Sequence, residues 1–359
     1  MKNGCIVIRN IKSYLCGEDF SGIADALADG GYFIDKMFLL SEEDEREFSQ
    51  TFAECKNFFE NVFVVATEEK LASLRAAACG VLKLQPVDGA RIEQDKKTFF
   101  FLKSGASLAP FVREEVVPYL DAKYAVRHDK MVIRAVGVPA ERLKNVLNEA
   151  KAVSGDRLAY NVSEKWGDLR LEILYDSDSP KMLIDTVMRT VVGGFNDYIY
   201  ATEDTPLADR IFEILKLRGL KLSVAESFTG GGVAKRLIEV PGISSVLFES
   251  IVAYDNGSKM SRLGVSKYTL MRQGAVSDET AYEMAAGLIA SGNCSVSLST
   301  TGIAGPKSDN TGKPVGLCFI AVGMKESVYV YKYIFKGGRE DITQRAINQA
   351  LFLLYKQIK

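Results

Sequence analysis

Short apolar runs alternate with longer amphipathic segments along the first 125 residues of the chain. Strands are predicted at residues 5–8, 32–40, 62–66 and 98–103, and helices at residues 21–29, 41–57, 67–79 and 108–120. Ser21 is a candidate N-cap, residues 41–44 have the form of a capping box, and Gly30 and Gly80 are candidate helix ends. Strands that alternate with helices predict a largely parallel sheet covered on both faces.

The same analysis divides the rest of the chain into two parts. Between residues 126 and 203, strands are predicted at 131–136, 158–162, 169–175 and 198–201, and helices at 139–152 and 179–192. After residue 204, strands are predicted at 222–225, 250–254, 294–300, 315–322 and 328–335, and helices at 207–218, 232–239, 258–263, 278–291 and 340–359. The pattern therefore predicts an α/β domain at 1–125, a small α+β module at 126–203 and a second α/β domain at 204–359.

Composition and charge narrow the class of protein. The chain of 359 residues is 47% hydrophobic and has a net charge of −1, typical of a globular protein. We find no signal peptide and no apolar run long enough to cross a bilayer, so we expect a cytoplasmic protein without a membrane partner. The module at 126–203 has balanced charge and no GxxG loop of the RNA-binding KH type. We therefore expect a spacer role for it, and no nucleic-acid partner.

Cysteine and histidine usage restricts the chemistry further. The cysteines at positions 5, 16, 55, 79, 294 and 318 are scattered, so we expect buried free thiols and neither a disulfide framework nor a zinc site. The single histidine, His128, lies in a polar stretch that favours a solvated surface loop. A Ser-His-Asp triad is therefore disfavoured, and any hydrolytic reaction needs a base other than histidine.

Two glycine-containing turns follow predicted strands of the last domain. The first, at residues 225–232, contains Ser227, Thr229 and three glycines. Its backbone amides can converge on an anion at a helix N-terminus, although Ser227 or Thr229 can equally be a plain N-cap. The second, at residues 300–306, is either a ligand loop or a buried turn. Since loops beyond the carboxyl ends of strands line the ligand crevice of open sheets, two such turns favour a small-molecule pocket.

Six ordered segments connect this domain with a known family. They are AESFTGGG (225–232), VAYDNGSK (252–259), GAVS (274–277), TTGIAGP (300–306), KPVG (313–316) and FKGGRE (335–340). Together they resemble the C-terminal domain of the CinA family of competence/damage-inducible proteins, over nearly all of residues 206–359. The resemblance implies a hydrolase of the pyridine nucleotide cycle, which converts nicotinamide mononucleotide to nicotinate mononucleotide and ammonia without a metal or cofactor.

The resemblance also implies roles for particular residues. Ser227 would be the nucleophile, with Lys259 as its base and Tyr254 as a proton relay or an orienting group. The glycine-turn amides would stabilise the oxyanion, and Arg339 would hold a phosphate. The residues implied to bind substrate are Thr229, Gly230, Gly231, Thr301, Gly302, Gly305 and Arg339. Taken singly, Tyr254 is more typical of a core aromatic at a strand end, and Lys259 and Arg339 are more typical of solvated surface charges.

Four positions depart from the family pattern, and one of them is Ser258, which replaces an alanine. Phe228 stands where relatives have cysteine, and it can narrow the site or fill core. Gly257 and Gly338 replace a glutamate and an aspartate. The proposed catalytic side chains are retained.

The front of the chain resembles the long form of the family, in which a domain similar to molybdopterin-binding proteins precedes a KH-like module. The glycine-rich turns of an active front domain are missing at residues 8–17 and 64–69. We therefore expect a degenerate, catalytically silent domain retained for architecture or dimerisation, and a homodimer by analogy.

Two other functions remain open. One is a non-catalytic nucleotide-binding or scaffold protein of the competence or DNA-damage response. The other is a metal-dependent ADP-ribose pyrophosphatase in the front domain, whose activity would not depend on Ser227.

Overall fold

The computed structural model describes residues 2–9, 17–41, 44–308, 312–325 and 327–359, and the side chains of residues 17–21 are not part of the description. The chain has a multidomain α/β fold with three separate sheets. It forms two compact units, one of Met1–Asp129 with Leu174–Ser179 and one of Lys130–Ile173 with Pro180–Lys359. The second unit holds both the middle module and the last domain, so the three-domain boundaries stay a prediction.

The first unit is built on a five-stranded sheet of order β2-β1-β3-β5-β4. Its strands are β1 (Asn3–Arg9), β2 (Lys36–Ser41), β3 (Asn61–Ala66), β4 (Arg91–Gln94) and β5 (Lys97–Lys103). Its helices are α1 (Gly17–Asp29), α2 (Glu45–Phe58), α3 (Glu68–Leu82), α4 (Leu108–Phe111), the π-helical turn η1 (Val112–Val116) and α5 (Val117–Tyr124). All strand pairs except β4–β5 are parallel, which confirms the largely parallel sheet.

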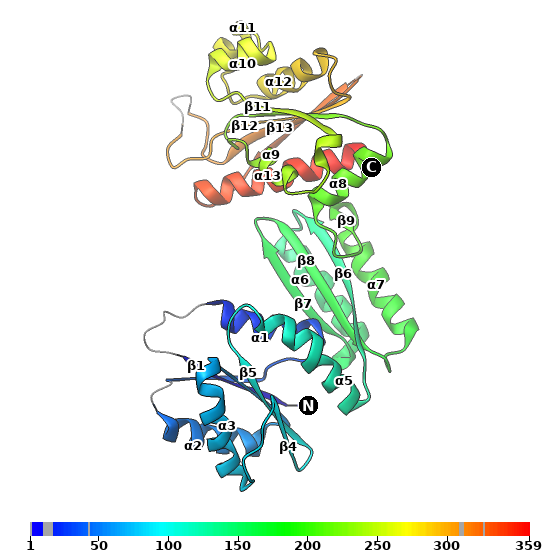
Figure 1. Cartoon of the computed structure of the whole chain (residues 1–359). Coiled ribbons are helices and arrows are strands. Elements are labelled where there is room, and N and C mark those ends of the chain that lie inside the picture. Colours follow the sequence, from blue (N-terminus) through cyan, green and yellow to red (C-terminus); the bar gives the residue numbers. More distant parts are fainter. Residues whose placement is uncertain (1, 10–16, 42–43, 309–311, 326) are drawn as a thin grey trace. The chain divides into compact units, whose positions relative to one another are not determined.

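Two apolar clusters, one on each face of this sheet, form its core. One joins α2 and α3 to the sheet, and the other joins α1, α4 and α5 to its opposite face, as Figure 1 shows. Burial of both faces explains the continuous apolar runs of β1 and β3. The edge strand β4 was not predicted because only its Ile92 is buried, so it carries almost no hydrophobic signal.

Several predicted helix boundaries in this unit are wrong. Ser41 ends β2, and the N-cap of α2 is Asp44, whose carboxylate accepts hydrogen bonds from the amides of Arg46 and Glu47 (both 2.9 Å). Helix α3 continues past Gly80 and ends before Lys83, which has a left-handed backbone. Helix α1 starts before Ser21, which is therefore not its N-cap.

The predictions for histidine and cysteine have different outcomes. His128 begins β6 instead of lying in a solvated loop, and its side chain is 18% exposed. Its ring lies edge-on to Tyr32 with 4.9 Å between centroids, so a packing contact replaces the expected solvation. The described cysteines are free thiols, buried except for the half-buried Cys294, while Cys16 lies outside the described residues.

The front domain shows one of the two altered turns. Only Thr67 separates β3 from α3, so the segment at 64–69 has no glycine-rich loop at the carboxyl end of the central strand. In the other segment, at 8–17, residues 10–16 lie outside the described residues.

The middle module has a four-stranded sheet of order β7-β8-β6-β9. Its elements are β6 (His128–Val136), α6 (Ala140–Ser154), η2 (Gly155–Arg157), β7 (Ala159–Lys165), β8 (Asp168–Asp176), α7 (Lys181–Phe195), η3 (Asn196–Tyr198) and β9 (Ile199–Ala201). Helices α6 and α7 pack against each other, and the α+β composition is as predicted.

The last domain has a five-stranded sheet of order β11-β10-β12-β13-β14. Its strands are β10 (Leu222–Glu226), β11 (Leu247–Val252), β12 (Val296–Gly302), β13 (Leu317–Met324) and β14 (Ser327–Ile334). Its helices are α8 (Leu207–Leu217), α9 (Gly232–Ile238), η4 (Ile243–Ser245), α10 (Asn256–Leu263), α11 (Lys267–Arg272), α12 (Asp278–Ala290) and α13 (Arg339–Ile358). Strands β11, β10 and β12 are parallel, and β13 and β14 are antiparallel to their neighbours.

Helices cover both faces of this sheet. Figure 1 shows α10, α11 and α12 on one face and α8, α9 and α13 on the other. The carboxyl ends of the central strands β10 and β12 therefore meet at one edge between the two helical layers, which is where open α/β sheets bind ligands. Within the described residues, no helix combines the length and apolar character needed to span a membrane.

Candidate active site

Ser227 lies at the carboxyl edge of the central strands. It directly follows β10, and its backbone amide donates a hydrogen bond to the carbonyl oxygen of Thr300 on β12 (3.0 Å). This bond ties the start of the turn to the neighbouring strand. The side chain is almost buried, with the residue 8% exposed.

Lys259 lies beside Ser227. Its Nζ is 3.1 Å from Ser227 Oγ, and it donates hydrogen bonds to the carbonyl oxygens of Ala253 (2.8 Å) and Tyr254 (3.0 Å). The residue is 1% exposed, and this burial lowers the pKa of the Lys259 amine, with the nearby Asp255 charge acting against the shift. A neutral amine has two N–H bonds and one lone pair. When both N–H groups bind the two carbonyls, the lone pair is left for the Ser227 hydroxyl.

Helix α10 fixes the position of Lys259. Its N-cap, Asp255, accepts a hydrogen bond from the amide of Gly257 (2.7 Å). A Cβ at position 257 would lie 2.9 Å from Asp255 Oδ1, so the glycine that departs from the family pattern fits this tight cap. At its other end, the Leu263 carbonyl approaches α12 at Gly287, where a Cβ would lie only 1.9 Å from that oxygen.

Tyr254 reaches the pair through its main chain. Its carbonyl oxygen accepts a hydrogen bond from Lys259. The residue is 63% exposed, and its hydroxyl lies 3.5 Å from Arg339 Nη2. Of the two roles considered for Tyr254, this geometry fits the orienting role, through the backbone. The predicted proton relay through the hydroxyl has no contact with Ser227 or Lys259 among the described hydrogen bonds.

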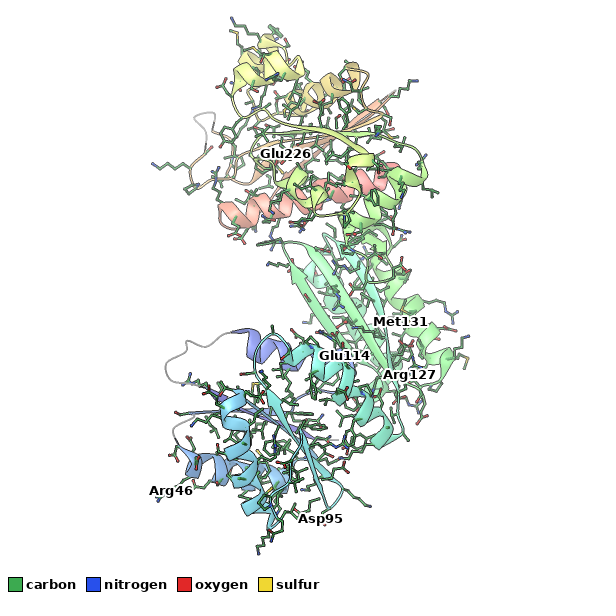
Figure 2. All side chains as sticks on the ribbon, in the orientation of Figure 1. Arg46, Asp95, Glu114, Arg127, Met131 and Glu226 are labelled. Carbon is green, nitrogen blue, oxygen red and sulfur yellow. The ribbon has the colours of Figure 1, made fainter. Side chains whose placement is uncertain are left out.

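Glu226 is the site residue that sequence reasoning missed. It is fully buried at the start of the turn, and its carboxylate accepts hydrogen bonds from the amides of Gly231 (3.0 Å), Val233 (3.1 Å) and Ala234 (2.9 Å). Figure 2 labels Glu226 in the last domain. A carboxylate at a helix N-terminus satisfies its free amides and complements its dipole. The available signal was an acidic residue that ends an otherwise apolar strand before a glycine-rich turn.

This carboxylate changes the predicted role of the glycine turn. The amide of Gly231 binds Glu226, and the amides of Gly230 and Gly232 donate to the carbonyls of Ser227 (3.1 Å) and Thr229 (2.9 Å). The amides of the three glycines are therefore occupied by protein oxygens, and an anion at this turn would need the amides of its other residues. Within the described part of the chain, the amides of Phe228 and Thr229 have no hydrogen-bond acceptor.

The second turn supports the first. The hydroxyls of Thr229 and Thr300 lie 2.7 Å apart, which links the two turns. The fully buried Thr301 donates from its hydroxyl to the carbonyl of Ala275 (2.6 Å), so its side chain holds structure and is not presented to a ligand. A Cβ on Gly302 would lie 3.0 Å from a ring carbon of Phe228 and closer still to Cys318, so the close packing requires glycine.

Phe228 belongs to the core. It is 7% exposed and packs in an apolar cluster with Ala304, Cys318, Ile342 and Ala346. Of the two roles considered for this departure from the family pattern, the core-filling role is the one that the structure supports.

Arg339 opens α13 near both turns. Its Nη1 donates to the carbonyl oxygen of Gly305 (2.7 Å), a residue whose φ of +83° requires glycine. Its Nη2 lies beside the Tyr254 hydroxyl. The residue is exposed, so N–H groups of its guanidinium face solvent. The structure thus brings Ser227, Lys259 and the Tyr254 main chain together, and joins Tyr254, Gly305 and Arg339 in a second group.

Comparisons with known proteins identify the family. A family model described as the CinA C-terminal domain matches residues 204–358. A competence-damage inducible protein of Caldanaerobacter subterraneus is 31% identical over 331 residues, which cover 91% of this chain and 79% of that relative. The chain belongs to the CinA family.

Other members of the CinA family match shorter parts of the chain. A competence-damage inducible protein of Clostridium beijerinckii is 35% identical over 272 residues, and the match spans 66% of that relative's length. A CinA-like protein of Fusobacterium nucleatum is 44% identical over 178 residues, which cover 49% of this chain and 43% of that relative. A crystal structure of a competence/damage inducible protein from Agrobacterium tumefaciens has 36% identity, a TM-score of 0.41, and coverage of 43% of this chain and 94% of its own.

Proposed function

We propose that the last domain is a serine amidohydrolase that converts nicotinamide mononucleotide to nicotinate mononucleotide and ammonia. The observation that carries this proposal is the buried pair of Ser227 and Lys259, with 3.1 Å between Oγ and Nζ. A serine hydroxyl is a weak nucleophile unless a base removes its proton, and this chain's only histidine lies in the other unit. A lysine with a lowered pKa supplies that base.

The reaction follows the covalent course of other serine hydrolases. Lys259 takes the proton from Ser227 as Oγ forms a bond to the carboxamide carbon. The protonated Lys259 then gives a proton to the amide nitrogen, and the C–N bond breaks. Ammonia is released, and the acyl group stays bound to Ser227 as an ester. Lys259 takes a proton from water as the water attacks the ester. The Lys259 ammonium then returns this proton to Ser227 Oγ as the C–O bond of the ester breaks, which releases the acid and restores both residues.

The tetrahedral oxygen needs hydrogen-bond donors. We infer that the amides of Phe228 and Thr229 supply them, because they follow the nucleophile directly and have no acceptor within the described residues. One such donor is typically worth about 3–4 kcal/mol in the transition state. This assignment replaces the glycine amides, which bind Glu226 and the turn's own carbonyls.

The choice of substrate rests on the family resemblance and on Arg339. Its exposed guanidinium, held by Gly305 and next to Tyr254, suits bidentate contact with a nucleotide phosphate. The CinA membership of the chain supports the same activity. We also propose that the protein is a homodimer.

Release of ammonia from nicotinamide mononucleotide, measured without added metal, tests the proposal. We expect turnover in the wild type, none above background in Ser227→Ala, and wild-type turnover in Ser73→Ala, an exposed serine of the first unit. Folding of each variant is checked by circular dichroism. If the folded wild type binds the nucleotide without turnover, the amidohydrolase proposal is wrong and a binding or scaffold role replaces it.

A further inference from the structure

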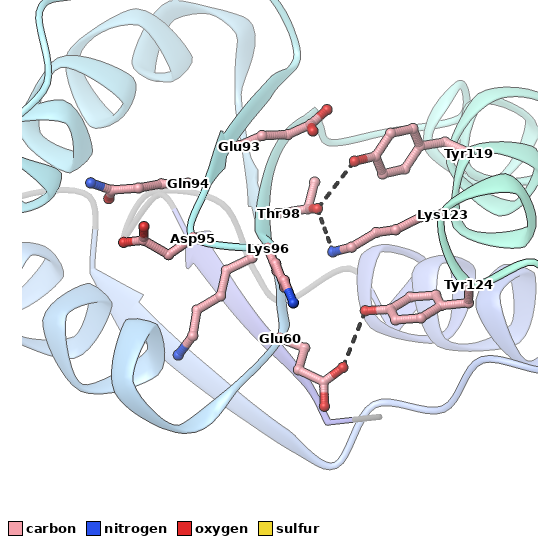
Figure 3. A pocket seen from close by; sticks show the side chains of 10 residues that line it. Glu60, Glu93, Gln94, Asp95, Lys96, Thr98, Tyr119, Lys123 and Tyr124 are labelled. Carbon is pink, nitrogen blue, oxygen red and sulfur yellow. Dashed lines mark hydrogen bonds between the residues drawn. The ribbon is translucent and has the colours of Figure 1, made fainter.

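Buried polar side chains gather at the amino edge of the first unit's sheet. Asn3 begins β1, Asn61 begins β3 and Thr98 is the second residue of β5, and each is at most 3% exposed. Parallel sheets usually bind ligands at the carboxyl edge, so polar groups buried at the opposite edge need another explanation. Helix α5 extends Tyr119, Lys123 and Tyr124 toward this edge, as Figure 3 shows.

These residues form one hydrogen-bonded network. Lys123 Nζ donates to Thr98 Oγ1 (2.7 Å) and Asn61 Oδ1 (3.0 Å). Asn61 Nδ2 donates to Asn3 Oδ1 (2.8 Å) and Tyr124 Oη (2.9 Å). The hydroxyls of Tyr119 and Thr98 lie 3.3 Å apart. The network therefore fixes Lys123 and both tyrosines in one arrangement.

A cavity of about 660 Å³ opens in front of the network. Its lining includes Lys123, Tyr119 and Tyr124 together with Glu60 and Glu93. This volume lies within the range of about 300–1,000 Å³ that is usual for small-molecule sites. A network that served only to hold α5 on the sheet would not need such a space.

The cavity has a half-buried cation, Lys123, and two exposed carboxylates, Glu60 and Glu93, at its rim. Burial lowers the pKa of Lys123, while the charges of Glu60 and Glu93 oppose the shift, so both carboxylates act on this amine. The ammonium group has three N–H donors, and two bind Asn61 and Thr98. Lys123 Nζ also lies over the Tyr124 ring, 5.1 Å from its centroid, but within the described residues the third N–H has no oxygen or nitrogen acceptor. This N–H can therefore donate to a ligand.

Three further charged residues, Asp95, Lys96 and Lys97, also line the cavity. Asp95 and Lys96 are exposed and carry opposite charges, so together they leave the charge balance of the cavity unchanged. Lys97 Nζ donates to the carbonyl oxygens of Lys56 and Asn57 and is therefore engaged with the main chain. Arg91 forms an ion pair with one carboxylate oxygen of Glu93 (2.9 Å) and lies over the Tyr119 ring. Glu60 accepts a hydrogen bond from the Tyr124 hydroxyl (3.3 Å).

We propose that this cavity binds a small zwitterion of the α-amino-acid class. Its carboxylate binds the third N–H of Lys123, and its ammonium group faces Glu60 and Glu93 at the rim. A simple anion would meet these two carboxylates, and a simple amine would meet Lys123, so both are disfavoured. This site is independent of the amidohydrolase proposal, since all of its residues belong to the first unit.

Ligand-observed saturation-transfer NMR on the full-length protein tests the site, with the twenty standard amino acids as separate probes. Each amino acid that binds is then compared by calorimetry with its deaminated acid and its decarboxylated amine. We expect at least one amino acid to bind and both analogues to bind about tenfold more weakly or worse. Absence of binding by all twenty probes would overturn the proposal, as would equal binding of the deaminated acid.

Two variants separate the charges. Lys123→Met removes the cation at similar length, and we expect about tenfold weaker binding or worse, whereas Lys103→Met, an exposed lysine paired with Glu68, retains affinity. Glu60→Gln alters an exposed residue and keeps an oxygen that can accept the Tyr124 hydrogen bond, and we expect it to weaken binding of the amino acid but not of its deaminated acid. Wild-type affinity in folded Lys123→Met or in Glu60→Gln contradicts the proposal.

Discussion

At the scale of single residues, the proposed amidohydrolase activity depends on Lys259, a buried lysine whose pKa is lowered by its burial. Lys259 is surrounded by two carbonyl oxygens and one hydroxyl, and its pKa is lowered by burial. These contacts distinguish it from an ordinary surface lysine. Two groups of Tyr254 make different contacts. Its carbonyl oxygen accepts a hydrogen bond from Lys259, and its hydroxyl lies near Arg339.

The first prediction concerns the base. Lys259→Met should lower kcat by about 10²–10⁴-fold, and Lys259→Arg should do the same because a guanidinium stays protonated. In the wild type, kcat should rise as pH increases through the lowered pKa of Lys259, since only the neutral amine accepts the serine proton. The pH profile of ammonia release measures this, with the exposed Lys267→Met as control. A profile that is flat in the wild type, or Lys259→Arg with full activity, contradicts the role.

The second prediction concerns Tyr254. Tyr254→Phe removes the hydroxyl and keeps the carbonyl that holds Lys259, so kcat should be nearly unchanged. Because the hydroxyl is exposed and beside Arg339, KM should rise by less than about tenfold, as expected for one exposed hydrogen bond. Steady-state kinetics separate the two parameters. A large loss of kcat with unchanged KM would restore the proton-relay role.

At the scale of elements, the site is built where two strand ends and two helix starts meet. Strand β10 delivers Ser227, helix α10 delivers Lys259, and the carboxylate of Glu226 closes the first turn of α9. The positions of these elements depend on close packing at glycines, above all Gly287 against the end of α10.

The third prediction concerns Glu226. Glu226→Gln should lower the free energy of unfolding by about 2–4 kcal/mol, because an amide group presents a donor where three backbone N–H groups need acceptors. Urea denaturation measures this change. Ser250→Ala, which removes only a long 3.4 Å contact to the same carboxylate, should cost less than about 1 kcal/mol. Equal stability of wild type and Glu226→Gln would show that the carboxylate does not hold the turn.

The fourth prediction uses two helical glycines with opposite surroundings. Gly287→Ala should destabilise the protein by about 1–3 kcal/mol and reduce activity, since its Cβ meets the Leu263 carbonyl and displaces the helix that carries Lys259. Gly80→Ala has nothing within 4 Å of the added Cβ and should stabilise the protein by about 0.5–1 kcal/mol. Thermal unfolding and ammonia release compare the two. The reverse order of stabilities would contradict the packing argument.

At the scale of the whole molecule, the sequence allowed the α/β fold and most of the elements to be predicted, because strands buried on both faces have continuous apolar runs. It did not reveal β4, where a single residue is buried, or the end of α3, where Lys83 and not Gly80 has the left-handed backbone. The pairing of Ser227 with Lys259 is a contact over 32 positions, which only the family resemblance suggested. The occupation of the glycine-turn amides by Glu226 follows from burial, which local sequence does not encode.

The fifth prediction separates the two units. Nicotinamide mononucleotide hydrolysis should be unaffected by EDTA, because its proposed groups are a hydroxyl, an amine and backbone amides of the last domain. The 359-residue chain should not hydrolyse ADP-ribose with added Mg²⁺, since the turn after β3 has no glycine-rich loop. Product analysis with each nucleotide measures both. Metal-dependent cleavage of ADP-ribose that survives Ser227→Ala would assign catalysis to the front domain.

The burial of Lys259 has a consequence for chemical modification of the protein. A lowered pKa increases the fraction of an amine that is unprotonated at neutral pH, so we expect Lys259 to react more readily with an acylating reagent that reaches it than a solvated lysine does. Because Lys259 is only 1% exposed, a bulky reagent cannot reach its amine. We therefore expect small electrophiles to modify Lys259 more selectively than large ones. A small electrophile can enter beside Ser227 and react with the Lys259 amine, which larger labels do not reach.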